Sequence, residues 1–290
     1  MTTAASLPAR FGLKLTTKGE TIDAQRDIWR VADDGGFDHL WASDHLASPA
    51  PDPTLPCLDG WTVLGAMAAV TSRVHVGLNV SGNAYRHPGA LAKIATTVDH
   101  LSAGRLELGL GAAWNEAEFK MFGLPFLSTP ERICALEESV RIVKALWTED
   151  LVTFAGQFYQ VDHAIAEPKP IQKPHPPIWI GGSGPKLTLR VVAQLADVWS
   201  AHGADKAPIG SSKTLDEHCA AVGRDPASIR RSVMVRFSSP DEALRETETY
   251  LRAGFNEILL RIGGGPDTRQ QADDAVALLP RLRALAANST

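Results

Sequence analysis

A carboxylate and an imidazole stand next to each other in the segment WASDH, residues 41–45, as Asp44 and His45. Such a pair can position and tune a general acid or base near neutral pH. The same residues also allow a purely structural interpretation, in which Asp44 caps the following loop and His45 is merely half buried. Their spacing alone leaves both interpretations open.

A second segment with possible ligand contacts is GLGAAWN, residues 109–115. It does not match the dinucleotide-binding pattern GxGxxG, because Trp114 stands where the last glycine belongs. Its small residues Gly111 and Ala112 still permit a close approach of the backbone to a ligand. The alternative is that the glycines ease packing inside a barrel, and the segment alone does not decide between the two.

A third segment, GGSGPK at residues 181–186, combines Gly181, Gly182, Ser183 and Gly184 with a proline and precedes an apolar helix. Free N–H groups at a helix N-terminus, together with the helix dipole, attract phosphate. A plain glycine turn is the alternative. Pro185 at the first helical position favours the anion site, so we predict that residues 181–184 bind a phosphate group.

The elements that would position these segments alternate regularly along the chain. Short apolar runs occupy residues 11–15, 39–43, 74–81, 106–111, 177–182, 197–201, 233–237 and 257–262, with longer segments of helical period between them. Such runs are typical of strands buried on both faces of a parallel sheet. About eight βα units predict a (β/α)8 TIM barrel with its functional groups on the loops after the strands. A doubly wound sheet is the alternative, but the first βα turn lacks a dinucleotide fingerprint.

Several helix boundaries can be predicted from capping residues. Thr129 is expected as an N-cap before a proline, Thr214 and Glu217 as a capping box, and Ser239 as the start of another helix. Residues 151–173 interrupt the βα alternation with two β-rich pieces, which predict a small hairpin after the fourth helix. We therefore expect a single barrel domain over residues 1–290 with this hairpin as an excursion.

Composition excludes several classes of function. The 290 residues carry a net charge of −4 without a basic stripe, which argues against nucleic acid as a partner. No apolar run reaches the ~20 residues of a membrane span, and the N-terminal residues do not resemble a secretion signal. The three cysteines form neither a disulfide framework nor a CxxC metal pair. We expect a soluble cytoplasmic protein, and the lack of HExxH and Walker A motifs disfavours metal-dependent and nucleotide hydrolysis.

Taken together, three segments resemble the luciferase-like monooxygenase family and, within it, the branch that uses the deazaflavin coenzyme F420. They are WASDHL at residues 41–46, VGLNVSGNAYRHPGALAKIATTVDHLSAGRLELGLGAAWNEAE at residues 76–118, and IWIGGSGPKLTLRVVAQLADVWS at residues 178–200. The resemblance extends from about residue 11 to residue 262, and residues 85–115 are its most specific part.

The resemblance implies a flavin-shaped cofactor at the barrel mouth, with hydride moving to or from its central ring carbon. Asp44 and His45 match a segment that supplies a cofactor contact and, in several deazaflavin members, a catalytic histidine. The pair Asn79-Val80 matches a non-proline cis peptide that supports the ring. Residues of two loops would line the ring or hold the cofactor phosphate: Gly111, Ala112, Trp114 and Asn115 for the ring, and Gly181, Gly182, Ser183 and Gly184 for the phosphate.

These implications lead to a deazaflavin-dependent oxidoreductase that moves a hydride between F420 and a small organic molecule. His45 would be the proton donor or acceptor, and Asp44 would orient it or bind the cofactor. Some sugar-phosphate dehydrogenases of this branch place a glutamate near Trp114, and its absence here argues against that substrate class. Family members are often dimers, so we expect a homodimer.

Two other functions remain open. One is an FMN-dependent monooxygenase supplied with reduced FMN by a separate partner reductase. The other is a non-catalytic protein that binds or carries a deazaflavin or flavin. The pair of Asp44 and His45 argues against a carrier, because a carrier needs no acid or base.

Overall fold

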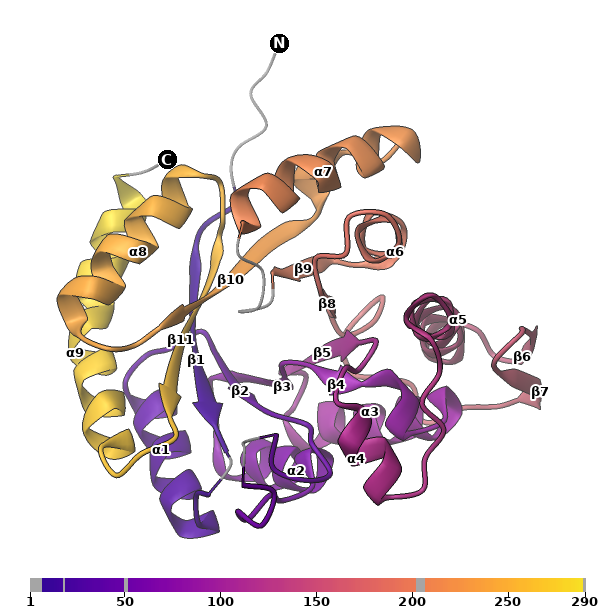
Figure 1. Cartoon of the computed structure of the whole chain (residues 1–290), viewed down its shortest axis with the longest axis horizontal. Helices are drawn as coiled ribbons and strands as arrows, with labels where there is room; N and C mark the ends of the chain where they lie inside the picture. Colours follow the sequence, from indigo (N-terminus) through magenta and orange to yellow (C-terminus); the bar gives the residue numbers. More distant parts are fainter. Residues whose placement is uncertain (1–6, 18, 50–51, 202–206, 289–290) are drawn as a thin grey trace.

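The structure is a computed structural model that describes residues 7–17, 19–49, 52–201 and 207–288. Its centre is a ring of parallel strands (Figure 1). The ring consists of β1 (Arg10–Thr16), β2 (His39–Ala42), β3 (His75–Leu78), β5 (Leu106–Gly111), β8 (Ile178–Gly181), β9 (Val198–Ala201), β10 (Arg230–Arg236) and β11 (Glu257–Gly263). Hydrogen-bonded neighbours follow the order β3-β2-β1-β11-β10-β9-β8-β5, and a pairing of β3 with β5 closes the ring. The predicted (β/α)8 barrel is therefore confirmed.

Helices surround the ring and cover its outer face (Figure 1). They are α1 (Ile22–Asp34), α2 (Gly60–Val70), α3 (Pro88–Leu101), α4 (Glu116–Met121), α5 (Thr129–Thr148), α6 (Thr188–Leu195), α7 (Pro208–Ala221), α8 (Pro240–Arg252) and α9 (Thr268–Ala287). Two 3-10 turns, η1 (Asn83–Tyr85) and η2 (Pro226–Ser228), and a two-residue strand, β4 (Ser81–Gly82), complete the connections. Within the described ranges, no helix is both long enough and apolar enough to cross a membrane.

The segment after α5 forms a separate two-stranded antiparallel sheet of β6 (Val152–Ala155) and β7 (Gln160–Ala164). Figure 1 shows this hairpin at the periphery, beyond α5 and away from the ring. The hairpin that the sequence predicts between residues 151 and 173 is thus present. It does not contribute a strand to the barrel.

Two of the three helix starts predicted from capping residues are wrong in detail. Helix α5 is capped by Ser128, which forms a capping box with Glu131, so Thr129 is already the first helical residue. Thr214 lies inside α7, because that helix begins at Pro208, and its hydroxyl faces the helix backbone. In both places an earlier residue can also begin the helix: Ser128 as the cap of α5 and Pro208 as the first residue of α7. The capping pattern by itself does not show which residue begins the helix.

Side chains of the ring strands alternate between the outer core and the barrel interior. On β11, for example, Ile258 and Leu260 belong to the main core under the helices. Leu259 instead points inward, where it packs with Trp41 and Trp179 in a second apolar cluster. This alternation identifies the residues of every strand that face the barrel interior. The inward-facing residues nearest the C-terminal end of each strand face the barrel mouth.

The interior at the N-terminal end of the strands holds buried charges. The carboxylates of Glu107 and Glu257 are completely buried. Glu107 pairs with Arg10 and accepts a hydrogen bond from the Trp179 indole, and Glu257 lies 2.7 Å from Nε2 of His39. Burial raises the pKa of Glu107, but its contacts with histidine and arginine side chains outweigh burial and hold that pKa well below its usual value.

We expect Glu107→Gln to lower the free energy of unfolding at pH 7 by about 2–3 kcal/mol, because Arg10 would lose its charged partner in a largely buried site. The glutamate pKa is depressed in the folded state, so its contribution is present above the unfolded pKa of about 4.3 and fades as the pH falls below it. Urea unfolding at neutral and acidic pH measures both effects.

Glu137→Gln is a matched control, because Glu137 pairs with Arg141 on the surface of α5. It should change the free energy of unfolding by less than about 0.5 kcal/mol. If the Glu107 variant were as stable as the control variant, or if its deficit did not shrink on acidification, the buried charges would not stabilise the barrel as described.

Candidate active site

The loops after the ring strands bring His45 and Glu118 together at the barrel mouth. Nδ1 of His45 lies 2.7 Å from Oε1 of Glu118. The His45 side chain is 19% exposed, whereas that of Glu118 is fully buried. The Trp114 ring stands edge-on to the imidazole, with 6.2 Å between ring centroids. Since Nδ1 is occupied and no described residue bonds to Nε2, the second nitrogen of His45 is free for a ligand.

Glu118 is held in place by three further donors. The Tyr85 hydroxyl donates to Oε2 at 2.7 Å, the Asn115 amide to Oε1 at 2.6 Å, and the backbone N–H of Leu46 to Oε2 at 3.2 Å. Burial raises the pKa of Glu118, but hydrogen bonds from His45, Tyr85 and Asn115 outweigh burial, so its pKa lies below the usual value. Glu118 is therefore ionised at neutral pH and keeps the proton of His45 on Nδ1.

Glu118 is the site residue that sequence reasoning missed. It lies on α4, three residues after Asn115, the residue that precedes the helix. The spacing of Asn115 and Glu118 is that of a capping box, which could have drawn attention to it. The sequence shows no glutamate at the family's position near Trp114. In the structure, Glu118 in the first turn of α4 nevertheless contacts His45.

Asp44 does not take the orienting role that the sequence suggested. Its carboxylate is fully buried, accepts a hydrogen bond from the Ser81 hydroxyl at 2.5 Å and pairs with Arg86 at 2.7 Å. Arg86 also pairs with Asp59, the N-cap of α2. Asp44 thus ties the loop after β2 to two neighbouring segments, and the orienting contact to His45 comes from Glu118 instead. The contacts of Asp44 are structural ones, and its predicted role as a cofactor contact stays a prediction.

The predicted non-proline cis peptide is present between Asn79 and Val80, directly after β3. The Val80 side chain lies against two glycines of neighbouring strands. A Cβ atom on Gly111 would lie 2.7 Å from one Val80 methyl group, and a Cβ on Gly181 would lie 3.0 Å from both. A Cβ on Gly109 would lie only 2.0 Å from the carbonyl oxygen of Leu78. Close packing within the barrel therefore explains these glycines, which was one of the two interpretations left open.

The loop over residues 181–184 follows β8 and is fixed by its neighbours. The Gly182 N–H donates to the Ser200 carbonyl at 3.2 Å, and its carbonyl accepts from the Trp199 indole at 2.8 Å. Gly182 has a φ of 122°, which favours glycine. Helix α6 begins only at Thr188, so the prediction that Pro185 is its first residue is wrong. Residues 185–187 form a turn there instead.

Two buried polar atoms of this region have no partner among the described residues. They are Ser183 Oγ, on the loop after β8, and Asn79 Oδ1, at the cis peptide. The Asn79 amide nitrogen donates to Ser200 Oγ across the mouth at 3.0 Å. Buried polar atoms are normally paired, so these two fit groups that a bound ligand would satisfy. Both belong to segments for which the sequence predicted cofactor contacts.

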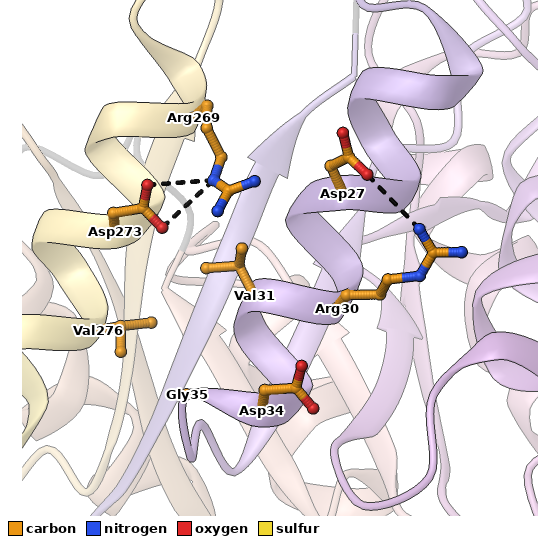
Figure 2. Close-up of a pocket in the computed structure, with 8 residues that line it drawn as sticks. All are labelled: Asp27, Arg30, Val31, Asp34, Gly35, Arg269, Asp273 and Val276. Atoms are coloured by element: carbon orange, nitrogen blue, oxygen red, sulfur yellow. Dashed lines mark hydrogen bonds and ion pairs between the residues drawn. The ribbon is translucent and has the colours of Figure 1, made fainter.

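A groove of about 430 Å³ also lies on the outer surface, between α1 and α9 (Figure 2). Four of its charged side chains form pairs within one helix: Arg30 with Asp27 at 3.5 Å, and Arg269 with Asp273 at 3.1 Å. Figure 2 shows these residues on the helices, outside the ring of strands. The groove is therefore separate from the barrel mouth, where the candidate acid or base lies.

Comparison with known sequences decides the family. The sequence pattern of the luciferase-like monooxygenase family matches residues 1–286. The chain belongs to this family. As a luciferase-like protein it is an enzyme of the oxidoreductase class, as the resemblance in the sequence implied.

Relatives of this luciferase-like enzyme span most of its length. An uncharacterised protein of Mycobacterium tuberculosis (strain H37Rv) is 33% identical over 94% of this chain and 97% of its own length. An F420-dependent glucose-6-phosphate dehydrogenase of Microbacterium testaceum is 32% identical over 84% of this chain and 74% of the relative. An F420-dependent secondary alcohol dehydrogenase, solved with an F420-acetone adduct, has the same fold with a TM-score of 0.85 at 19% identity, covering 95% and 99% of the two chains.

Proposed function

We propose that this luciferase-like enzyme is an F420-dependent oxidoreductase that transfers a hydride between the deazaflavin and a small organic substrate, with His45 as the acid or base. The observation that carries the proposal is the contact of 2.7 Å between His45 and the buried Glu118 at the barrel mouth. Several relatives named as F420-dependent dehydrogenases also support the proposal.

The cofactor site in this proposal consists of the segments around the mouth. Asn79 and Val80 would support the ring from β3, and residues 111–115 would border it from β5. Residues 181–184 would hold the phosphate, with Ser183 Oγ as a free buried hydroxyl. When bound, the deazaflavin supplies the hydride chemistry, whereas the protein supplies orientation and charge.

The protein's own contribution is a positioned proton carrier. Nε2 of His45 would accept a proton from the substrate during oxidation, or donate one during reduction. Glu118 would hold the imidazole in one orientation and stabilise its charged form, as a buried carboxylate does next to a catalytic histidine. Trp114 borders the imidazole on one side. Because its side chain is 61% exposed, we propose that a bound substrate covers it.

The second candidate is a two-component monooxygenase that receives reduced FMN from a separate reductase. It is supported by a relative named FMNH(2)-dependent dimethylsulfone monooxygenase from Pseudomonas putida, which is 31% identical. A non-catalytic deazaflavin carrier is the third. The buried carboxylate of Glu118 next to His45 argues against a carrier, because a carrier would not need an oriented acid or base.

Titration of the purified protein with F420 and with FMN separates these candidates. We expect saturable binding of F420 and affinity for FMN weaker by about tenfold or more, which corresponds to about 1.4 kcal/mol. Ser183→Ala should weaken F420 binding, because it removes a hydroxyl that the proposal assigns to the phosphate. Tighter binding of FMN would support the monooxygenase, and tight F420 binding without turnover on any substrate would support the carrier.

We further propose that residues 1–290 form a single barrel domain and that two chains form a dimer in the cytoplasm. Family resemblance supports the dimer. The three free cysteines Cys57, Cys134 and Cys219 support a reducing compartment. Sedimentation equilibrium should give twice the mass of one chain, and the mass of a single chain would contradict the dimer.

A further inference from the structure

Three cationic side chains form a row across neighbouring strands at the barrel mouth. Lys14 near the end of β1 is paired in register with Arg261 of β11, and Arg261 is paired in register with Arg236 of β10. All three lie toward the C-terminal ends of their strands, the end at which His45 follows β2. We call Lys14, Arg261 and Arg236 the mouth row.

Strand alternation places these side chains inside the ring. On β10, Val233 and Val235 belong to the outer core, whereas Met234 packs with the inner cluster. On β11, Leu259 likewise belongs to the inner cluster. Arg236 and Arg261 follow Met234 and Leu259 by two residues, so they lie on the same inward face, one layer nearer the mouth. Both arginines are exposed there.

The mouth row lacks the counter-charges that the other end of the same strands possesses. At the N-terminal end, Arg10 of β1 pairs with Glu107, and Arg230 of β10 pairs with Glu257. None of the three mouth-row cations forms an ion pair with a carboxylate in the part of the chain that the structure describes. Neighbouring cationic side chains that are not paired with a carboxylate repel each other when charged, and a bound anion would relieve that repulsion.

Lys14 is the buried member of the mouth row and connects it to the histidine loop. Its side chain is 4% exposed, donates to the Ser43 hydroxyl at 2.9 Å and also bonds to the Ala42 carbonyl. Ser43 precedes His45 by two residues. An anion held by the mouth row would therefore lie next to the loop that carries the proposed acid or base.

We propose that the mouth row binds the anionic group of the substrate, a carboxylate or another oxyanion such as a phosphate. Arginine guanidinium groups suit such oxyanions, because they can donate two parallel hydrogen bonds. The identification of the anion as part of the substrate rests on the proposed function. The binding of an anion to the mouth row does not depend on the proposed function.

The mouth row is distinct from the loop assigned to the cofactor phosphate. In the closed ring, β2, β3 and β5 separate β1 from β8 on one side, and β11, β10 and β9 separate them on the other. The loop at residues 181–184 follows β8, so it lies across the mouth from Lys14. Two anionic groups could thus bind on opposite sides of the mouth, one from the cofactor and one from the substrate.

Calorimetric titration with sulfate tests the row without knowledge of the substrate. We expect sulfate to bind at the mouth row, and Arg261→Gln and Arg236→Gln should each weaken this binding by about tenfold or more, because each removes a charged hydrogen-bond donor. Arg245→Gln is the matched control, since Arg245 is exposed on α8 and its substitution removes the same positive charge. A wild-type chain that does not bind sulfate, or equal weakening by the control substitution, would overturn the proposal.

The pH dependence of sulfate binding provides a second readout. Burial and the charge of Arg261 lower the pKa of Lys14 to about 7, although Asp44 acts in the opposite direction. Only protonated lysine attracts an anion, so sulfate affinity should fall as the pH rises above about 7. Lys14→Met should weaken binding below that pH and abolish the dependence. An unchanged pH dependence in the Lys14 variant would contradict the assignment of Lys14 to the site.

A parallel titration with F420 distinguishes substrate from cofactor as the source of the anion. We expect Arg261→Gln to leave F420 affinity within about twofold and sulfate to bind the F420 complex as it binds the free protein. Loss of F420 affinity in this variant would assign the row to the cofactor and overturn its role in substrate binding. Failure of the wild-type protein to bind F420, with normal sulfate binding, would refute the proposed function but support the anion site.

Discussion

Replacement of His45 by alanine is expected to lower kcat by about 10²- to 10⁴-fold while the dissociation constant of F420 stays within about twofold. The reason is that no described residue bonds to Nε2 of His45, whereas the predicted cofactor contacts other than Asp44 follow β3, β5 and β8. Turnover can be followed by the absorbance of the deazaflavin with any substrate found by screening, and affinity by cofactor titration.

His163→Ala serves as the control for His45→Ala, because His163 lies on the β6–β7 hairpin and its side chain is 72% exposed. It should leave turnover unchanged. Equal losses of turnover and cofactor affinity in the His45 variant would show that His45 contributes to binding or folding, and would reject its role as the acid or base.

The second large effect is expected for Glu118→Gln, which should lower kcat by about 10- to 100-fold. Glutamine keeps the size of the side chain but removes the charge that stabilises a protonated imidazole. We class Glu118 as a positioning residue, because it acts through His45. Because Glu118 acts through His45 and does not touch the substrate, KM should change by less than about twofold.

Glu116→Gln is the matched control, since Glu116 is an exposed residue of the same helix. It should change neither kcat nor KM. If Glu118→Gln raised KM as much as it lowered kcat, Glu118 would stabilise the loop without acting through the histidine. Glu118→Asp should restore part of the activity, because it returns the charge at a shorter reach.

The barrel could be predicted from sequence because buried parallel strands leave a strong local signal. Apolar runs such as residues 106–111 and 257–262 coincide with strands β5 and β11 to within one residue. The proline after Ser239 correctly marked the start of α8. Helix starts are harder to predict where several residues could cap the helix. The observed starts of α5, α6 and α7 differ from the predicted ones.

The site could be predicted only in part, because its contacts join residues that are distant in the chain. His45 was found from its position after a strand, but its partner Glu118 lies 73 residues away. Asp44, the adjacent carboxylate, was the natural choice from sequence, yet it bonds to Ser81 and Arg86. The mouth row was also invisible, because Lys14 meets Arg261 only when the first and last strands pair.

A crystal structure of the protein with bound F420 tests the central claim most directly. We predict that the deazaflavin ring lies at the mouth beside Val80, that its phosphate contacts residues 181–184, and that Nε2 of His45 faces the space above the ring, where a substrate would bind. A ring bound outside the mouth, or a His45 turned away from it, would contradict the proposed mechanism.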